Sequence, residues 1–367
     1  MTVVQMLPAL QGGGVEKGTL EVARHLVQRG HRSIVISAGG RLVEQLEREG
    51  SRHLAWDVGA KRLRTLRWVG RLRRFLQETR PDILHLRSRL PAWIGWWAWK
   101  GLPPGQRPHL VTTVHGRYSV GRYSAVMTRG ETVIAVSEMI RDYVLDNYPE
   151  VDPQRVRVIH RGVDPAAYPH SYRPPPEWLA AWRRQFPGLE GKYLITLPGR
   201  LTRLKGQEHL IDVVAELRRR DLPVHGLMVG GADPQKRRYE EELRERIRQD
   251  GLQQDITLTG HRGDLREIMA VSDVVLSLSL EPEAFGRTTL EALSLGRPVA
   301  AYDHGGVAEQ LAVILPQGRV AVADRQAMAA LLAEWRRSPP AVPRHQPFTL
   351  EKMLDQTLAV YTELVLT

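Results

Sequence analysis

The sequence has 367 residues, 42% of them hydrophobic and 25% charged, which is enough chain for two globular domains. It contains no cysteine, which excludes disulfide bonds, thiolate metal sites and a cysteine nucleophile. The net charge of +11 resides in the first half, because residues 1–175 carry 27 Lys and Arg against 15 Asp and Glu. This asymmetry indicates either an anionic partner or an arginine-rich genome, since 45 of the 52 basic residues are arginine.

The first half alternates short β-rich runs with amphipathic helical stretches, which predicts a parallel, doubly wound sheet. The first run lacks the basic flank and apolar length of a secretory signal, and no uninterrupted apolar run reaches about 20 residues. We therefore expect a cytoplasmic protein without a spanning helix. Strands are predicted at 2–7, 33–37, 82–86, 109–114, 132–136 and 156–160, and helices at 16–29, 41–49, 64–79, 89–100 and 137–147.

A proline-rich connector follows at Asp164-Pro165, Pro169 and Pro174 to Pro176, and the alternation then restarts. We predict two α/β domains, at 1–170 and 177–348, and a C-terminal helix at about 349–367 that packs back on the first. Ligands of such sheets bind at the carboxyl ends of the strands, so we expect a cleft between two facing sheets. The second half has predicted strands at 192–198, 224–230, 255–259, 273–278 and 298–301, and helices at 206–220, 235–250, 264–270, 287–295 and 324–336.

Two loops after predicted strands suit an anionic ligand. Gln11 to Glu16 contains three glycines and opens the first helix, where backbone can approach a ligand and free N–H groups face an anion. The alternative is a tight turn only. Leu197 to Gly206 places Arg200 and Lys205 before a helix, and two such cations suit a diphosphate. The alternative there is a solvated basic loop.

Two further segments carry carboxylates and a histidine. In Glu281 to Glu291, Glu283 precedes a helix and Glu291 lies two turns into it, so they would reach different parts of one ligand. Glu283 suits sugar hydroxyls and Glu291 suits a ribose; the alternative is an acidic, exposed helix start. His115 ends the run Thr112-Thr113-Val114, at the edge where a sheet presents ligand contacts, although a structural role is also open.

Taken together, these segments resemble the family of retaining glycosyltransferases that includes lipopolysaccharide-core glucosyltransferases and envelope glycolipid mannosyltransferases. The resemblance runs from Gly12 to about Leu311 and includes Ala135 to Asp164, Leu293 to Val299 and Gly305 to Glu309. It implies a GT-B fold, in which two Rossmann-like, doubly wound parallel-sheet domains face each other across a cleft. It also implies transfer of a sugar from a nucleoside diphosphate to an acceptor.

The resemblance assigns roles residue by residue. Glu283 and His115 would act on the transferred sugar, and Arg200 and Lys205 would grip the diphosphate. Glu291 would bind the ribose. The remaining nucleotide contacts would come from the glycine-rich loop and the helix start, at Gly13, Gly14, Phe285, Gly286, Arg287 and Thr288.

The expected co-substrate is a UDP- or GDP-linked sugar, with no resident cofactor. No Asp-x-Asp pair occurs in the chain, so we expect no metal clamp on the diphosphate. After Glu309, residues Gln310 to Gly318 look shorter than the family's glycine-containing loop, which puts the contacts of that loop in doubt. Two alternatives are a nucleotide-sugar epimerase of the same fold and a basic nucleic-acid-binding protein. We expect no nucleic-acid partner, because no reading helix or aromatic sheet is recognisable.

The basic first half contains two candidate acceptor or membrane surfaces. In Lys61 to Phe75, apolar residues recur every three positions among arginines, which indicates a surface helix or an interfacial face. Pro91 to Lys100 holds four of the nine tryptophans, which indicates a core helix or a membrane interface. We expect an anionic glycan or glycolipid acceptor of the lipopolysaccharide or envelope type. We also expect peripheral, salt-sensitive contact with anionic lipid at the inner leaflet of the cytoplasmic membrane.

Overall fold

The computed structural model describes residues 1–232 and 238–366, which form two compact units. Unit 1 contains Met1–Arg161 and the segment from Glu351 onward, and unit 2 contains Gly162–Leu350. The predicted domains were 1–170 and 177–348 with a C-terminal helix. No helix among the described residues is both long and apolar enough to cross a membrane.

Unit 1 is built on one sheet of seven parallel strands in the order β3-β2-β1-β4-β5-β6-β7. Val4 in the central strand β1 pairs with Ile34 of β2 on one side and Leu84 of β4 on the other. Both faces are covered, so the strand interiors are buried and mostly apolar, with a few buried polar residues such as Gln5 and His85. The strands are β1 Thr2–Met6, β2 Arg32–Ser37, β3 Arg52–Ala55, β4 Ile83–Leu86, β5 His109–Val114, β6 Thr132–Ala135 and β7 Val156–Val158.

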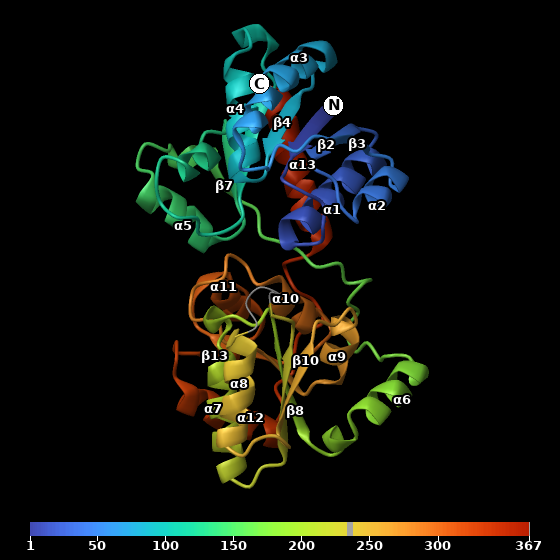
Figure 1. Ribbon diagram of the computed structural model, residues 1–367, viewed down its shortest axis with the longest axis vertical. Helices are drawn as coiled ribbons and strands as arrows, with labels where there is room; N and C mark the ends of the chain where they lie inside the picture. Colours follow the sequence, from blue (N-terminus) through green and yellow to red (C-terminus); the bar gives the residue numbers. More distant parts are fainter. Residues whose placement is uncertain (233–237, 367) are drawn as a thin grey trace. The chain divides into compact units, whose positions relative to one another are not determined.

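The helices of unit 1 connect these strands in sequence. Ser137 caps α5, because its Oγ accepts a hydrogen bond from the Ile140 N–H at 3.2 Å. The C-terminal helix α13 runs along the sheet (Figure 1), where its Tyr361 hydroxyl lies 2.6 Å from His85 Nδ1 on β4. The helices are α1 Gly14–Gln28, α2 Val43–Arg48, α3 Arg67–Thr79, α4 Arg89–Lys100, α5 Glu138–Asn147 and α13 Leu350–Leu366, with 3-10 turns η1 Leu63–Leu66, η2 Pro104–Gln106, η3 Ser124–Thr128 and η4 Pro153–Arg155.

Unit 2 repeats this architecture with six parallel strands in the order β10-β9-β8-β11-β12-β13. The central strand β8 pairs with β9 through Ile195 and Gly226, and with β11 through Ile195 and Val274. The order of both sheets reverses beside the first strand of the unit, which is where such sheets bind ligands. The strands are β8 Tyr193–Pro198, β9 Val224–Val229, β10 Ile256–Gly260, β11 Val274–Ser277, β12 Val299–Tyr302 and β13 Arg319–Val320.

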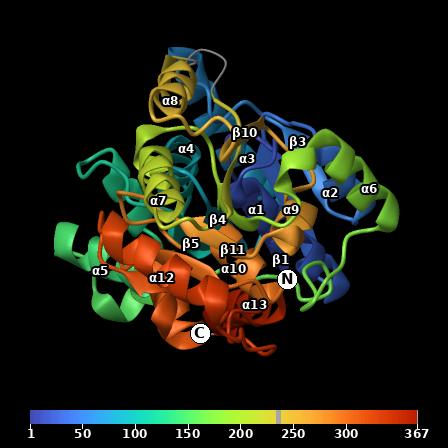
Figure 2. The same ribbon diagram turned by 90° about the horizontal axis from the view of Figure 1, so that it is seen from below.

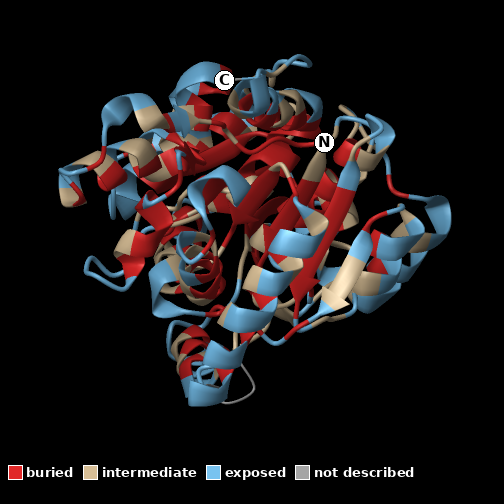
Figure 3. Ribbon diagram, turned by 90° about the horizontal axis from the view of Figure 1, so that it is seen from above, coloured by how far each residue is buried: buried red, intermediate tan, exposed pale blue. Residues whose placement is uncertain are grey.

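The helices of unit 2 cover its sheet, and α7 and α12 lie side by side (Figure 2). In Figure 3 the strands are largely buried, whereas the helices alternate buried and exposed residues, as amphipathic helices do. The helices are α6 Pro176–Gln185, α7 Gln207–Arg219, α8 Arg238–Gln249, α9 Leu265–Val271, α10 Arg287–Ser294, α11 Gly305–Ile314 and α12 Arg325–Arg337, with 3-10 turns η5 Pro187–Leu189, η6 Arg203–Lys205 and η7 Pro316–Gly318.

The sequence analysis missed four elements. The edge strands β3 and β13 have four and two residues, too few for a periodic signal. Helix α6 begins at Pro176, because proline is tolerated in the first turn of a helix; the predicted connector therefore ends one residue earlier. Helix α11 continues to Ile314, so Gln310 to Ile314 are helical and not part of a shortened loop. Of the helix predicted at 235–250, residues 235–237 lie outside the described residues.

Candidate active site

The loop that follows β8 positions the two predicted diphosphate cations. Gly206 has φ +73 and caps α7, and a Cβ there would lie 2.2 Å from the Leu278 carbonyl oxygen. The loop is therefore held against the end of β11, and Lys205 points toward the segment after that strand. Arg200 is exposed, and its guanidinium has no hydrogen-bond or ion-pair partner within residues 1–232 and 238–366. Its charge is available to a ligand.

Lys205 and Glu283 form an ion pair at the carboxyl end of the sheet. Lys205 Nζ lies 2.8 Å from Glu283 Oε1, and the two side chains are 32% and 28% exposed. The hydroxyl of Ser279 donates to the same Glu283 oxygen at 2.6 Å. Burial raises the pKa of Glu283, but the charge and hydrogen bond of Lys205, with hydrogen bonds from Ser279 and Ser277, outweigh it and lower the pKa. Glu283 is therefore an ionised carboxylate at neutral pH.

The start of α10 is held by α11, a helix that the sequence analysis did not predict. Gly306 packs against the backbone of Ala284 and Phe285, and its N–H donates to the Glu283 carbonyl at 2.9 Å. Gln310 Nε2 donates to the carbonyls of Phe285 and Gly286. These bonds fix the backbone carbonyls that precede the first turn of α10.

Two further features fix the first turn of α10. Gly286 adopts φ +87, and a Cβ there would lie 2.4 Å from Val307 Cγ2. Phe285 is 3% exposed and packs edge-on against Phe348. The predicted nucleotide contacts Arg287 and Thr288 are half-buried in that turn. An anion at this position would face the amino end of α10 and the positive end of its helix dipole.

Glu291, the predicted ribose contact, is buried in α10 and is 9% exposed. Its Oε1 is 3.9 Å from Arg287 Nε. Burial and the neighbouring Glu291 carboxylate raise the pKa of Tyr168 to about 12, with a hydrogen bond between the two side chains. Glu291 is thus engaged by Tyr168 and Arg287 within unit 2, and a ribose would compete with these contacts. Its predicted role stays a prediction.

In unit 1 the glycine-rich loop and His115 lie at carboxyl ends of strands. Gly13 and Gly14 are exposed, and a Cβ at Gly14 would meet nothing within 4 Å. Of the three glycines Gly12, Gly13 and Gly14, only Gly12 has a left-handed φ, of +139.

His115 Nδ1 lies 2.6 Å from Nη2 of Arg161. Burial, followed by the charges of Arg161, Arg87 and His85, holds the pKa of His115 well below its ordinary value, so the imidazole is neutral.

Comparison with protein families identifies both halves of the chain. Residues 12–167 match the model of Glycosyltransferase Family 4, and residues 180–344 match the model of Glycosyl transferases group 1. The chain is a glycosyltransferase of this two-domain type. The match confirms the predicted class of enzyme, whereas retention of configuration and the more specific subfamily are not tested by it.

The glycosyltransferase has known relatives and structural neighbours. It is 29% identical to alpha-maltose-1-phosphate synthase of Mycolicibacterium smegmatis over 286 residues, covering 70% of this chain and 69% of the relative. It spans 38% to 69% of the length of the first three curated relatives. A glycosyltransferase structure from Rickettsia africae ESF-5 has a TM-score of 0.85 at 29% identity and covers 99% of this chain and 98% of that one.

The structure of Anabaena HepE in complex with UDP-glucose has a TM-score of 0.81 at 22% identity, covering 99% of this chain and 100% of that one. At this identity the likeness shows the fold alone. Together with the two parallel sheets, these neighbours confirm the predicted GT-B fold of the glycosyltransferase.

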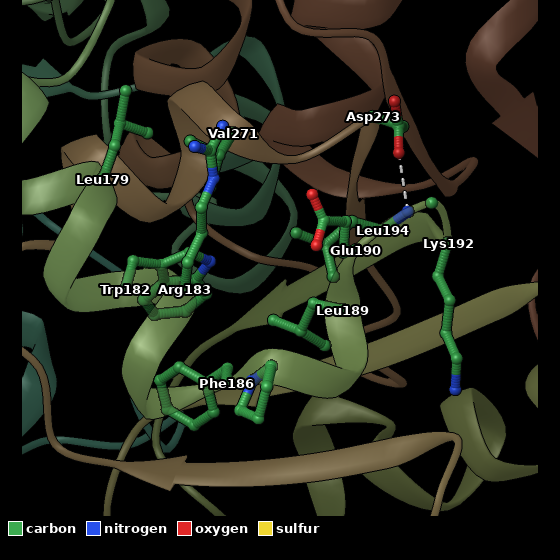
Figure 4. A pocket seen from close by; sticks show the side chains of 12 residues that line it. Leu179, Trp182, Arg183, Phe186, Leu189, Glu190, Lys192, Leu194, Val271 and Asp273 are labelled. Carbon is green, nitrogen blue, oxygen red and sulfur yellow. Dashed lines mark hydrogen bonds between the residues drawn. The ribbon is translucent and has the colours of Figure 1, made fainter.

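A separate hollow of about 330 Å³ lies in unit 2 of the glycosyltransferase. Figure 4 shows Trp182 and Arg183 of α6 along one side and Glu190 on the other, near Asp273, whose carboxylate accepts a 2.6 Å hydrogen bond from the Leu194 N–H. Leu194 is at the amino end of β8, whereas Gly199 follows its carboxyl end. This hollow is therefore distinct from the predicted donor site.

The sequence analysis missed several residues that shape the two sites. Ser279 and Gln310 contact the backbone or side chains around Glu283, and Arg87 and Arg161 surround His115. Single serine and glutamine side chains carry no sequence signal of their own. Arg87 did carry a sequence signal, because it directly follows a predicted buried strand. The sequence analysis did not single it out, because the chain contains many arginines.

The structure revises the two candidate acceptor surfaces of unit 1, the basic stretch from Lys61 to Phe75 and the tryptophan-rich helix α4. Leu72 is buried, whereas Leu63 and Leu66 are 89% and 52% exposed, because η1 and α3 do not share one helical face. On α4 the Trp93 ring lies 5.6 Å from Trp96 and 5.0 Å from Trp97. We call Trp93, Trp96 and Trp97 the tryptophan cluster. Cations stack on it, with the Arg129 guanidinium 4.0 Å from the Trp96 ring centroid.

Proposed function

We propose that this glycosyltransferase moves a sugar from a nucleoside diphosphate to an acceptor with retention of anomeric configuration. The observation that carries the proposal is the pairing of Lys205 with Glu283 beside the first turn of α10. Cations and the amino end of α10 gather there at the carboxyl end of a parallel sheet, which is where such sheets bind ligands. Retention is supported by the family resemblance of the sequence, and NMR of the product anomer would test it.

The chemistry follows from charge. As the bond between sugar and diphosphate breaks, negative charge grows on the leaving phosphate. Lys205, already held by its ion pair with Glu283, would stabilise this charge together with the exposed Arg200 and the positive amino end of α10. Glu283, held ionised by Lys205, is an acceptor for hydroxyl groups of the transferred sugar. His115 contact with that sugar stays a prediction.

We propose that the donor is a UDP- or GDP-linked sugar bound without a metal ion. UDP-glucose is the first donor to test, because the Anabaena neighbour of the same fold binds it. The absence of an Asp-x-Asp pair in the sequence and the placement of Lys205 support a protein cation in the place of a metal. Activity that is unchanged by EDTA would support this; activity that is lost with EDTA and restored by Mg²⁺ or Mn²⁺ would contradict it.

We further propose that unit 1 binds an anionic envelope glycan or glycolipid, at the inner leaflet of the membrane. The positive charge of the first half supports this, as do the cations around the tryptophan cluster and the exposed Leu63 and Leu66. Binding to vesicles that contain about 30% anionic lipid, but not to neutral vesicles, would support it, and the binding should weaken with salt. Equal binding to both vesicles would contradict it.

A panel of nucleotide sugars tests the whole proposal. The true donor should raise the melting temperature by mass action, and transfer to acceptor or slow hydrolysis should follow. Glu283→Gln should reduce turnover strongly. Glu267→Gln is the matched control, because Glu267 is also a carboxylate with a lowered pKa, paired with Arg266 at 2.7 Å on α9. The proposal fails if no nucleotide sugar binds, or if the two variants turn over equally.

A further inference from the structure

A single hydrogen bond from His304 links two loops of the candidate donor site. His304 lies two residues past β12 and directly precedes α11, and its side chain is half-buried. Its Nε2 lies 2.7 Å from the backbone carbonyl oxygen of Ser279, which lies two residues past β11. Strands β11 and β12 are neighbours in the sheet of unit 2. The bond therefore joins the carboxyl ends of two adjacent strands.

The partner of His304 decides which ring nitrogen carries the proton. A carbonyl oxygen only accepts hydrogen bonds, so Nε2 of His304 is protonated and donates to Ser279. Within residues 1–232 and 238–366, the imidazole has no other hydrogen-bond or ion-pair partner. The polar contact that this side chain makes with the fold is therefore the bond to Ser279.

Ser279 connects this bond to the ionised carboxylate of the site. The residue is 5% exposed, its hydroxyl donates to Glu283 Oε1 at 2.6 Å, and the same hydroxyl lies 3.4 Å from Nζ of Lys205. Hydrogen bonds weaken steeply as their distance and angle depart from the optimum. A shift in the backbone of Ser279 would therefore move the hydroxyl and weaken its bond to Glu283.

The main chain beside His304 is packed against Glu283 as well. Gly305 has φ +65, and a Cβ there would lie 2.7 Å from the carbonyl oxygen of Glu283. The N–H of Gly306 donates to that same oxygen at 2.9 Å. The backbone of Glu283 is thus held by glycines, whereas its carboxylate is held by Ser279 and Lys205. The His304 side chain can act on the carboxylate through Ser279.

We propose that His304 is a positioning residue for the sugar transfer: it holds Ser279 in place, and Ser279 aims the carboxylate of Glu283 at the transferred sugar. The inference rests on the proposed function of this site. His304 acts through Ser279 and needs no contact with the donor. Displacing a reacting group by about 1 Å can cost roughly 100-fold in rate. Loss of the bond between His304 and Ser279 should therefore be visible in turnover.

Two substitutions of His304 separate the hydrogen bond from the start of α11. His304→Gln keeps an N–H donor as many bonds from Cβ as Nε2 of histidine, so it can still reach Ser279. The amide of His304→Asn is one bond shorter and loses that reach, but asparagine is a preferred N-cap residue, so the start of α11 is preserved. The kcat of His304→Asn should fall about 10- to 100-fold, and that of His304→Gln should stay close to wild type. Equal kcat values in the two variants would overturn the proposal.

His170→Asn is the matched control. His170 is also a half-buried histidine of unit 2, and its Nε2 lies 3.2 Å from a backbone carbonyl oxygen, that of Val342. It packs against Gly296, beyond the last residue of α10, whereas Glu283 precedes that helix. The control should keep its kcat, and a loss as large as that of His304→Asn would count against a specific role for His304.

Nucleotide binding separates positioning from a general loosening of the site. UDP and GDP lack the transferred sugar, so whichever of them binds wild type should bind His304→Asn with the same Kd in calorimetry. A parallel loss of nucleotide affinity and kcat would overturn the proposal, because a disordered site would lower both.

A cycle of melting temperatures tests the inference without any activity. It compares wild type, His304→Asn, Glu283→Ala and the double variant. If His304 acts on Glu283, the loss in the double variant should be smaller than the sum of the single losses by roughly 1–4 °C. Additive losses would overturn the proposal. If wild type neither binds nor turns over a nucleotide sugar, the proposed function fails, and this cycle still decides whether His304 positions Glu283.

Discussion

Replacing Lys205 by alanine should disable the enzyme while changing its stability little. The substitution removes a cation 2.8 Å from Glu283 and leaves that carboxylate with its hydrogen bond from Ser279. The matched control is Lys192→Ala. Lys192 pairs with Asp255 at 3.4 Å, and its side chain is 24% exposed, against 32% for the side chain of Lys205. Lys192 lies just before β8, at the end of the sheet opposite to Lys205, which comes after that strand.

The two lysines should have similar effects on stability and different effects on rate. Each ion pair is partly exposed, so each is worth about 1 kcal/mol, which lowers the melting temperature by roughly 2–4 °C in a unit of this size. Only Lys205 faces the predicted diphosphate. Loss of a preorganised donor to developing negative charge costs about 2.7–4 kcal/mol, or roughly 100- to 1000-fold in kcat.

The assay is steady-state transfer or donor hydrolysis, with melting curves of both variants and wild type. Lys205→Ala should lose kcat by about two to three orders of magnitude, and Lys192→Ala should stay within about twofold of wild type. The reasoning is refuted if both variants lose activity in proportion to their melting temperatures, since Lys205 would then act through the fold alone.

Three further changes test the surroundings of the sites. The pKa of Glu283 is lower in the folded protein than in the unfolded chain, so its ionised form stabilises the fold at pH values above its ordinary pKa. The difference in unfolding free energy between wild type and Glu283→Gln should therefore shrink as the pH falls below about 4. Denaturant unfolding at several pH values measures this difference. Gly286→Ala should cost about 1–3 kcal/mol, because φ is +87 and a Cβ would meet Val307 at 2.4 Å; a normal melting curve would contradict this. Tyr361→Phe should cost about 1–3 kcal/mol by leaving His85 Nδ1 unpaired, and hydrogen exchange should then rise in α13; unchanged exchange would count against it.

Helix α11 shows why part of the donor site escaped the sequence analysis. Its first residues, Gly305 and Gly306, are typical of a turn, and glycine is unfavourable inside helices. The structure places glycine there because a Cβ on Gly306 would lie 2.5 Å from Phe285 Cα. The need for close packing against a distant backbone segment overrides helix propensity, and no local pattern in the sequence reports it.

Local patterns in the sequence predicted the helices and strands whose apolar residues recur with a regular spacing. The mostly apolar runs of β1, β5 and β8 and the amphipathic repeat of α7 predicted parallel sheets with covering helices. The resemblance of the ordered motifs to a known family predicted a glycosyltransferase. The same patterns placed Lys205 and Glu283 near strand ends, since glycines and charged residues follow those apolar runs.

The sequence by itself determined the strand and helix alternation, the excess of positive charge in the first half and the residue types that gather at the strand ends. Only the tertiary structure decided which of these side chains are paired. It joined Lys205 to Glu283, engaged Glu291 with Tyr168, and brought Arg161 to His115. The reason is physical: periodicity reports burial along a single segment, whereas the protonation and pairing of a side chain depend on groups brought together from distant segments.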